Sequence, residues 1–139
     1  MMRYYLDTNI LVFILMLDKE NVSHKVANIL KDYSSILYTS SIAVKELLLL
    51  FRIGKLKSKQ YKSEHDILAE LKEADIEIRF FNPYHLEQYA KLTIFDSHKD
   101  MNDHAIIAQA IADKIPLISS DHAFQNYTSQ GLDFIFNKR

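Results

Sequence analysis

Short apolar segments alternate along this chain with longer segments whose apolar residues recur at helical spacing. The short segments predict strands at residues 4–6, 36–39, 76–80, 116–119 and 134–136. The longer segments predict helices at residues 9–17, 23–32, 42–53, 58–73, 83–93 and 101–113. Strands separated by helices favour right-handed crossovers and a parallel sheet covered on both faces. We therefore predict an α/β fold of three layers, in which helices flank a central, mostly parallel sheet of four to five strands.

Glycine and proline, which punctuate chains, are scarce, with two of each in 139 residues. No linker, repeat or low-complexity tract divides the sequence, so we expect residues 1–139 to form a single domain. Asn82 followed by Pro83 is a good helix start, because asparagine caps a helix and proline fits its first turn. The stretch 58–93 is expected to be mostly helical and to form a flank on the sheet.

The composition limits the classes of function. There is no cysteine, which excludes disulfides and thiolate metal sites. The formal net charge is −1, so any contact with nucleic-acid phosphates must come from a local basic patch. The apolar run at 10–17 is too short to span a bilayer, and no small residues mark a signal-peptide cleavage site after it. We therefore expect no membrane contact and a cytoplasmic location.

Two aspartates follow predicted strands. Asp7 comes directly after the first strand, and Asp121 comes shortly after the fourth. Open α/β sheets place their sites just beyond the carboxyl ends of strands, so both acids are candidate site residues. The alternative for each is a capping role, in which Asp7 caps the helix that follows it and Asp121 caps a short turn.

Two further acids lie on predicted helices, within otherwise apolar stripes. Glu46 shares a face with Ile42, Leu49 and Ile53, and Asp103 begins a stripe of isoleucines and alanines. A carboxylate on a buried face is costly unless it is paired, hydrogen-bonded or bound to a metal. The alternative for Asp103 is a favourable first-turn acid, and for Glu46 a buried ion pair with lysine or arginine. Convergence of four acids at one sheet edge favours a site for Mg²⁺ or Mn²⁺, which prefer oxygen ligands.

Four segments, in this order, resemble the motifs of the PIN-domain family. They are Leu6-Asp-Thr-Asn-Ile-Leu11, Thr39-Ser-Ser-Ile-Ala-Val-Lys-Glu46, His98-Lys-Asp-Met-Asn-Asp103 with the helix after it, and Leu117-Ile-Ser-Ser-Asp-His-Ala-Phe124. The ordered set spans essentially the whole chain. The resemblance implies a PIN fold and a magnesium-dependent endoribonuclease, of the kind that serves as the toxin in VapC-type toxin–antitoxin pairs.

The same resemblance assigns roles to individual residues. The family's catalytic and metal-binding acids map onto Asp7, Glu46, Asp103 and Asp121. Its small polar residues near the metal map onto Thr8 or Asn9 and onto Ser119. The chain departs from the family pattern at His104, where arginine is common, but no carboxylate is missing.

Hydrolysis of RNA by a two-metal-type mechanism is the chemistry we predict, with Asp7 and Asp103 as principal ligands. Two divalent ions about 4 Å apart activate water and neutralise charge on the phosphate. Glu46 and Asp121 complete the site directly or through water. One alternative is a metal-dependent phosphatase, although Asp7-Thr-Asn9 lacks the second aspartate of haloacid-dehalogenase-type sites. Another is a non-catalytic acidic binding module.

Basic residues cluster around the end of the Glu46 helix. The set comprises Lys45, Arg52, Lys55, Lys57, Lys59 and Lys62. A solvated face and an RNA-binding rim are equally good interpretations, and Lys45, Arg52 and Lys55 are the candidate RNA contacts. The six histidines show no metal-ligand spacing, and we interpret most of them as surface side chains: His24, His65, His85, His98, His104 and His122.

Two protein partners are expected. The resemblance implies a cognate antitoxin, which we predict docks on the helical flank and offers a cation to the carboxylates. The aromatics Tyr61, Tyr84 and Tyr89 are candidates for that surface, with core packing as the alternative. A homodimer is also predicted, because the run 47–51 is apolar on more faces than one core contact requires. A helix buried all round within one chain is the alternative.

Overall fold

The computed structural model describes residues 1–56, 58–95 and 97–139. The strands of its sheet are β1 (Met2–Leu6), β2 (Ser35–Ser40), β3 (Ile76–Arg79), β4 (Leu117–Ser119) and β5 (Phe134–Phe136). They lie in the order β3-β2-β1-β4-β5, and every neighbouring pair is parallel. The predicted α/β fold is confirmed, and the sheet reaches five strands.

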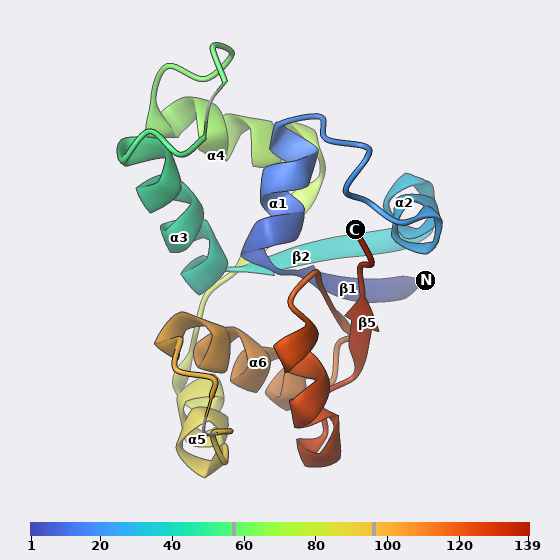
Figure 1. The fold of residues 1–139 in the computed structure, drawn as a ribbon, viewed down its shortest axis with the longest axis vertical. Coiled ribbons are helices and arrows are strands. Elements are labelled where there is room, and N and C mark those ends of the chain that lie inside the picture. The colour runs from blue at the N-terminus through green and yellow to red at the C-terminus, as the bar shows by residue number, and fades with distance from the viewer. Residues whose placement is uncertain (57, 96) are drawn as a thin grey trace.

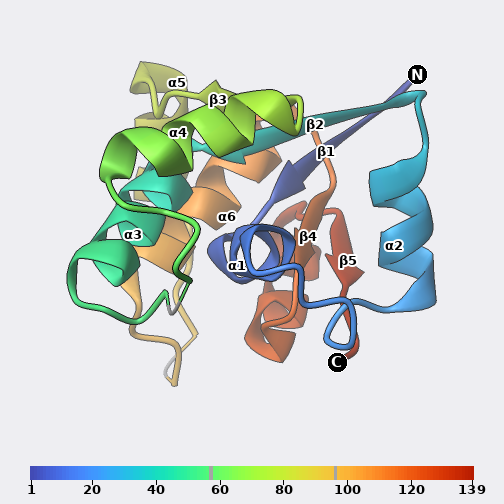
Figure 2. The same cartoon turned by 90° about the horizontal axis from the view of Figure 1, so that it is seen from above.

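Helices cover both faces of this sheet. They are α1 (Thr8–Leu15), α2 (His24–Lys31), α3 (Ser41–Arg52), α4 (Glu64–Glu73), α5 (Pro83–Lys91) and α6 (Met101–Asp113), and a 3-10 helix, η1 (His122–Gln130), follows β4. Figure 1 shows α1, α3 and α4 on one side of the sheet and α5 and α6 on the other. Seen from above in Figure 2, α1 lies between α3 and α2. The three layers are therefore those predicted.

The core lies where three helices meet the carboxyl end of β1. Leu6, Ile10, Leu11, Leu47 and Ile107 are fully buried, and they belong to β1, α1, α3 and α6. Each such side chain contributes roughly 1.5–3 kcal/mol through removal of its apolar surface from water. This packing fixes the starts of α1 and α6 and the middle of α3 close to the same edge of the sheet.

One helix starts later than the sequence suggested. A helix was predicted from Ser58, but α4 begins at Glu64 with Ser63 as its N-cap. The Ser63 hydroxyl accepts from the Asp66 amide, and the Asp66 carboxylate accepts from the Ser63 amide, which forms a capping box. Tyr61 precedes it in a buried position, where its hydroxyl donates to the carbonyl of Leu15 at 3.0 Å. These contacts hold the segment before α4 in a non-helical path.

The stretch 58–93 also differs from the expected single flank. The strand predicted at 76–80 is present as β3, an edge strand paired with β2, but the helices before and after it lie on opposite sides of the sheet (Figure 1). The helix predicted at 9–17 ends at Leu15, and Leu17 has a left-handed backbone with φ +53°. Asn82 caps α5, with Pro83 in its first turn, as predicted. That residues 1–139 form one domain stays a prediction. Among the described residues, no helix reaches the length and apolar character that a bilayer span requires.

Candidate active site

A pocket of about 380 Å³ opens at the carboxyl edge of β1 and β4. Its walls include the four predicted acids, Asp7, Glu46, Asp103 and Asp121, together with Asp100. Because β1 and β4 are parallel neighbours, the residues that follow them leave the sheet at the same edge. The structure therefore brings acids from four separate segments to one cavity, whereas their roles as metal ligands stay a prediction.

Asp7 is the most deeply held of these acids, with 3% of its surface exposed. The Ser119 hydroxyl donates to its Oδ2 at 2.6 Å, and the Asn9 amide donates to the same oxygen at 3.2 Å. The backbone N–H of Thr8 donates to Oδ1 at 2.8 Å, so Asp7 also caps α1. The capping role and the site position predicted as alternatives are both present.

Glu46 extends from the middle of α3 into the same pocket. Its carboxylate accepts from the Thr8 hydroxyl at 3.0 Å. Within the described part of the chain, no lysine or arginine forms an ion pair with Glu46, Asp7 or Asp121. The alternative of a buried ion pair for Glu46 is therefore not what the structure shows.

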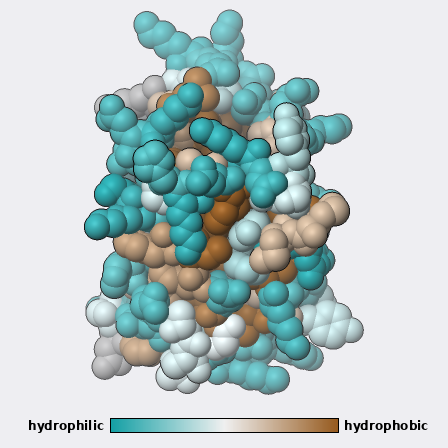
Figure 3. Space-filling view, turned by 90° about the vertical axis from the view of Figure 1, so that its right-hand side faces the viewer, coloured by the Kyte–Doolittle hydropathy of each residue, from teal (hydrophilic) through white to brown (hydrophobic). Residues whose placement is uncertain are grey.

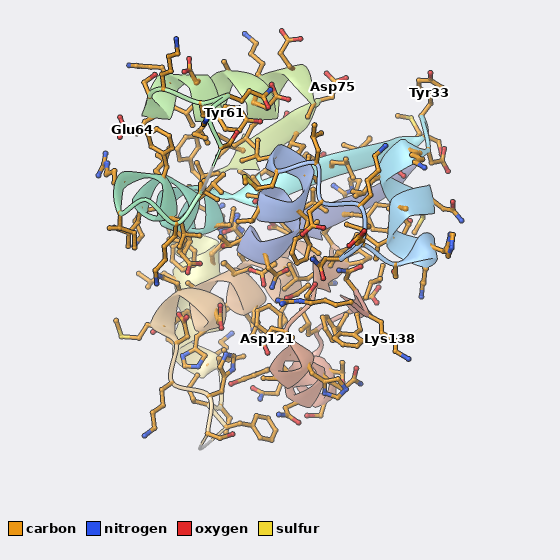
Figure 4. The ribbon with its side chains drawn as sticks, turned by 45° about the horizontal axis from the view of Figure 1, so that its top comes forward. Tyr33, Tyr61, Glu64, Asp75, Asp121 and Lys138 are labelled. Carbon is orange, nitrogen blue, oxygen red and sulfur yellow. The ribbon has the colours of Figure 1, made fainter. Side chains whose placement is uncertain are left out.

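Asp103 lies on the first turn of α6, and its nearest partner is a histidine. Nε2 of His98 is 3.0 Å from Oδ2 of Asp103. Ligand atoms of His98, Asp103 and Asp121 all lie within 4.8 Å of one another. Asp100 caps α6, and Asp121 accepts from the Ala123 amide at the start of η1. Figure 4 shows Asp121 near that start, on the far side of α1 from Tyr61.

Burial raises the pKa values of the acids in this pocket, and the negative charges of neighbouring acids raise them further. Burial raises the pKa of Asp7 to about 7, and the charges of Asp103 and Glu46 act in the same direction. Burial also raises the pKa of Asp103 to about 7, with further contributions from Asp100, Glu46 and Asp121. The pKa of Glu46 is raised chiefly by burial as well. A positive charge in the pocket would relieve all of these penalties.

The donor set fits a hard divalent cation. The pocket offers carboxylate oxygens from several segments, most of them without a cationic partner among the described residues. Mg²⁺ and Mn²⁺ prefer oxygen ligands of this type. The fit rests on the chemistry of the donors and on the mutual repulsion of their charges.

The sequence profile of the PIN domain matches residues 4–129, which is most of the chain. This chain belongs to the PIN-domain family. The four predicted acids all lie within the matched region. No curated protein gives a significant sequence match.

Solved structures share the fold of this PIN domain. A chain in the structure of VapBC2 from Rickettsia felis bound to a DNA fragment from their promoter has a TM-score of 0.69 and 22% identity, with 99% of this chain and 100% of that chain covered. A chain of DNA-bound VapBC from Salmonella typhimurium has a TM-score of 0.68 and 18% identity, with 98% of both chains covered. A chain of VapBC-5 from Mycobacterium tuberculosis, a member of the VapBC family of toxin–antitoxin systems, has a TM-score of 0.56 and 22% identity, with 99% of this chain and 98% of that chain covered. At these identities the likeness shows the fold.

Three polar residues, Thr8, Asn9 and Ser119, lie around Asp7, and their role in supporting a metal stays a prediction. Thr8 bridges to Glu46, and Asn9 connects Asp7 to β4, because its amide also donates to the Ser119 hydroxyl at 3.2 Å. The Asn9 carbonyl oxygen accepts from the Ser120 amide at 3.1 Å. The hydroxyl of Ser119 in turn accepts from the Asp121 amide at 3.0 Å, which ties two of the acids to one side chain.

The predicted basic residues lie at different distances from the pocket. Lys45 is adjacent to it, with its Nζ 3.5 Å from Oδ1 of Asn102. Arg52 is turned toward Glu64, and its Nε lies 3.4 Å from that carboxylate. Lys55 is exposed. Lys57 lies outside the described residues.

Three residues in or beside the pocket were not among the predicted site residues. Asp100 carries a recognisable signal, since its spacing to Asp103 suits a helix cap and a first-turn acid. His98 stands in the third motif, five residues before Asp103, but was interpreted as a surface side chain. Arg139 has no local signal, because only the fold brings it to the pocket. The Arg139 guanidinium carbon lies 5.3 Å from the centroid of the Phe13 ring, and both residues line the cavity.

The interpretation of most histidines as surface residues is wrong for three of the six. His85, His98 and His104 are buried, whereas His24, His65 and His122 are exposed. Each buried ring contacts hydrogen-bonding partners, which offsets the cost of dehydration. His85, for example, lies 2.9 Å from the Asp113 carboxylate, and its Nδ1 accepts from the Asn82 amide.

Proposed function

We propose that this PIN domain is a magnesium- or manganese-dependent endoribonuclease and the toxin of a type II toxin–antitoxin pair. The observation that carries the proposal is the pocket shared by Asp7, Glu46, Asp103 and Asp121. Family membership adds support, because it is established over most of the chain. Hydrolysis of an RNA phosphodiester bond by two-metal-type chemistry is the reaction we assign to it.

The metal would be held by Asp7 and Asp103, with Glu46 and Asp121 as further ligands or as partners through water. A bound divalent cation lowers the pKa of water and neutralises phosphate charge. Ser119, Asn9 and the Thr8 amide keep the Asp7 carboxylate in one orientation. Glu46, held by Thr8, can orient the attacking water or take up its proton.

Cations at the rim would hold the RNA backbone. Lys45 and Arg139 lie beside the acidic centre, and Arg52 and Lys55 lie further along α3 and beyond its end. The chain two residues before Arg139 is anchored by Asn137, which is fully buried. The Asn137 side chain accepts from the Ser23 amide at 2.8 Å and donates to the Ser120 hydroxyl at 2.7 Å. The Arg139 guanidinium lies over the Phe13 ring at the pocket wall, and its planar shape suits bidentate contact with phosphate.

A cleavage assay tests the activity against both alternatives. Purified protein is incubated with RNA and, separately, with a small phosphatase substrate, each with Mg²⁺ and with chelator. We expect endonucleolytic cleavage of RNA only in the presence of Mg²⁺. Hydrolysis of the small phosphate ester alone would show a phosphatase, and no turnover of either substrate would favour a binding module. The Asp103→Asn protein serves as the inactive control.

We also propose a cognate antitoxin, since the Mycobacterium tuberculosis neighbour belongs to a family of toxin–antitoxin systems. A groove of about 370 Å³ between α3, α4 and β3 offers apolar walls, including Val44 and Leu48, and lies next to Lys45. None of the predicted aromatics lines this groove: Tyr61 is buried, and Tyr84 and Tyr89 belong to α5 on the other side of the sheet. Co-expression with the adjacent open reading frame should yield a complex and relieve toxicity. Failure of both would contradict the proposal.

A homodimer and a cytoplasmic location complete the proposal. Leu49 and Ile53 on α3 and its end are 53% and 55% exposed, so the apolar run is not buried all round within one chain. Figure 3 shows that hydrophobic surface is also exposed among hydrophilic side chains on the face with α2 and both chain ends. Light scattering at micromolar concentration should give about twice the 16.3 kDa chain mass. A single-chain mass at all concentrations would contradict the dimer.

A further inference from the structure

His98 is a buried histidine at the edge of the acidic pocket, 7% exposed and without a role in the chemistry above. Its ring packs edge-on against His104, with centroids 4.8 Å apart, and against Tyr127 at 5.4 Å. Nε2 lies 3.0 Å from Oδ2 of Asp103, and Nδ1 lies 2.9 Å from the Tyr127 hydroxyl. Both ring nitrogens therefore have a partner, and one partner is a pocket acid.

The hydrogen bonds of Tyr127 indicate which nitrogen carries the proton. Its hydroxyl oxygen already accepts from the Phe95 amide at 3.3 Å, and its one hydrogen needs an acceptor because the side chain is fully buried. The available acceptor is Nδ1 of His98. A neutral imidazole that accepts at Nδ1 carries its hydrogen on Nε2 and donates it to Asp103. This arrangement satisfies all three side chains at once.

We propose that His98 is a positioning residue of the metal centre, with its tautomer set by Tyr127. The Nε2–H bond holds Oδ2 of Asp103 and leaves Oδ1 to face a cation. This inference rests on the proposed function, in which Asp103 is a metal ligand. Partners that orient metal ligands typically contribute about 10–100-fold to metal affinity.

Two other roles for His98 make different predictions. As a direct metal ligand, Nε2 would have to lose its hydrogen, and the site would favour ions that bind nitrogen, such as Zn²⁺, over Mg²⁺. As simple core packing, the ring would contribute to stability and not to metal affinity. Substitutions of His98, Tyr127 and His104, whose rings pack together, separate these roles.

Metal affinity in the absence of RNA is the decisive measurement. Calorimetric titration with Mg²⁺ and with Mn²⁺ should show affinity about 10–100-fold weaker for His98→Ala than for the parent, and Zn²⁺ is titrated alongside for comparison. His98→Gln keeps a donor near the Nε2 position and should recover most of that loss. Tyr127→Phe, which keeps the ring and every acid, should also weaken binding, because the tautomer is no longer fixed.

His104→Gln is the matched control. It removes a neighbouring ring from the same cluster but keeps a donor for the His98 carbonyl, which His104 Nε2 contacts at 2.8 Å. The free energy of unfolding in chelator should be lower than in the parent for both His98→Ala and His104→Gln. Metal affinity should fall only for His98→Ala. Equal metal affinity in the parent and His98→Ala would overturn the proposal. A much larger loss for Zn²⁺ than for Mg²⁺ would also overturn it, in favour of a direct ligand.

The tautomer can be measured without metal. Imidazole nitrogen-15 shifts in the metal-free chain should show neutral His98 with hydrogen on Nε2, and hydrogen on Nδ1 would overturn the inference. A protein that binds neither Mg²⁺ nor Mn²⁺ would overturn both this inference and the proposed function. A protein that binds the ions as described but leaves RNA intact would overturn only the function.

Discussion

The two halves of the acidic pocket are held in different ways. The sheet half consists of Asp7, Asn9 and Ser119 at the ends of β1 and β4, and neutral donors surround its carboxylate. The helix half consists of His98, Asp100, Asp103 and Asp121, where three carboxylates crowd together and His98 is hydrogen-bonded to Asp103 alone. Hydrogen bonds therefore fix the sheet half whether or not a cation is bound. The helix half keeps unbalanced negative charge, which makes it the half that gains most from a cation.

Substitution of either principal acid by asparagine should have the largest effect. Asp7→Asn and Asp103→Asn should each lower RNA cleavage at least about 100-fold, because a neutral amide is a poor ligand for a hard cation. The double variant should lose little more, since one half-built site is already inactive. Cleavage rates in Mg²⁺ measure this, and parent-like activity of a folded Asp103→Asn protein would refute the site.

The same pair of variants should differ in stability without metal. Asp103→Asn removes a charge from the crowded half, so its free energy of unfolding in chelator should hold or rise. Asp7→Asn turns an amide N–H toward the donors on Ser119 and Asn9, and the loss should be about 1–3 kcal/mol. Urea titration in chelator measures both. Equal shifts in the two variants would remove the distinction between the halves.

The metal-free protein should lose stability as the pH rises. The folded-state pKa values of Asp7 and Asp103 are raised to about 7, above those of an unfolded chain, so the folded state binds more protons between the two values. Unfolding free energy in chelator should therefore fall as the pH rises from about 4 to about 7, by several kcal/mol in total. Saturating Mg²⁺ should flatten or reverse the trend. A profile in chelator that rises over this range would contradict the raised pKa values.

Substitution of a neutral neighbour of the acids should lower the stability of the metal-free protein, whereas substitution of a charged neighbour should raise it. Ser119→Ala removes the hydroxyl that serves Asp7, Asn9 and Asp121, and it should cost about 1–3 kcal/mol of unfolding free energy. Asp100→Asn keeps a helix cap but removes a like charge beside Asp103, so the metal-free protein should be slightly stabilised. Thermal unfolding in chelator compares the two, and stabilisation by Ser119→Ala would be the contrary result.

The smallest effect is expected at the rim. Arg139→Ala should weaken binding of a single-stranded RNA a few-fold and lower the slope of log affinity against log salt by about 0.7. Lys138→Ala is the matched control, because it removes the same charge from a neighbouring residue, labelled in Figure 4, that lines a different groove. Fluorescence anisotropy of labelled RNA measures both slopes. Equal changes of slope in the two variants would show that Arg139 contributes only through the general charge of the surface.

The sequence by itself determined the layers and most of the candidate site. Periodicity predicted the strands and helices because apolar residues must face the core at the spacing of the element that carries them. The four acids were found because each stands where a carboxylate is costly or where a parallel strand ends. A local signal also placed the cap at Asn82, since capping depends on neighbours within one turn.

Only the tertiary structure decided which residues surround those acids. His98 stands only five residues before Asp103, but the fold buries its ring beside Tyr127, which is 29 residues away. Arg139 reaches the pocket because Asn137 pairs with Ser23, across 114 residues, and with Ser120. The late start of α4 likewise follows partly from a hydrogen bond between Tyr61 and Leu15. Contacts of this kind join segments that no local pattern relates, because their partners are chosen by packing and by the need to satisfy buried polar groups.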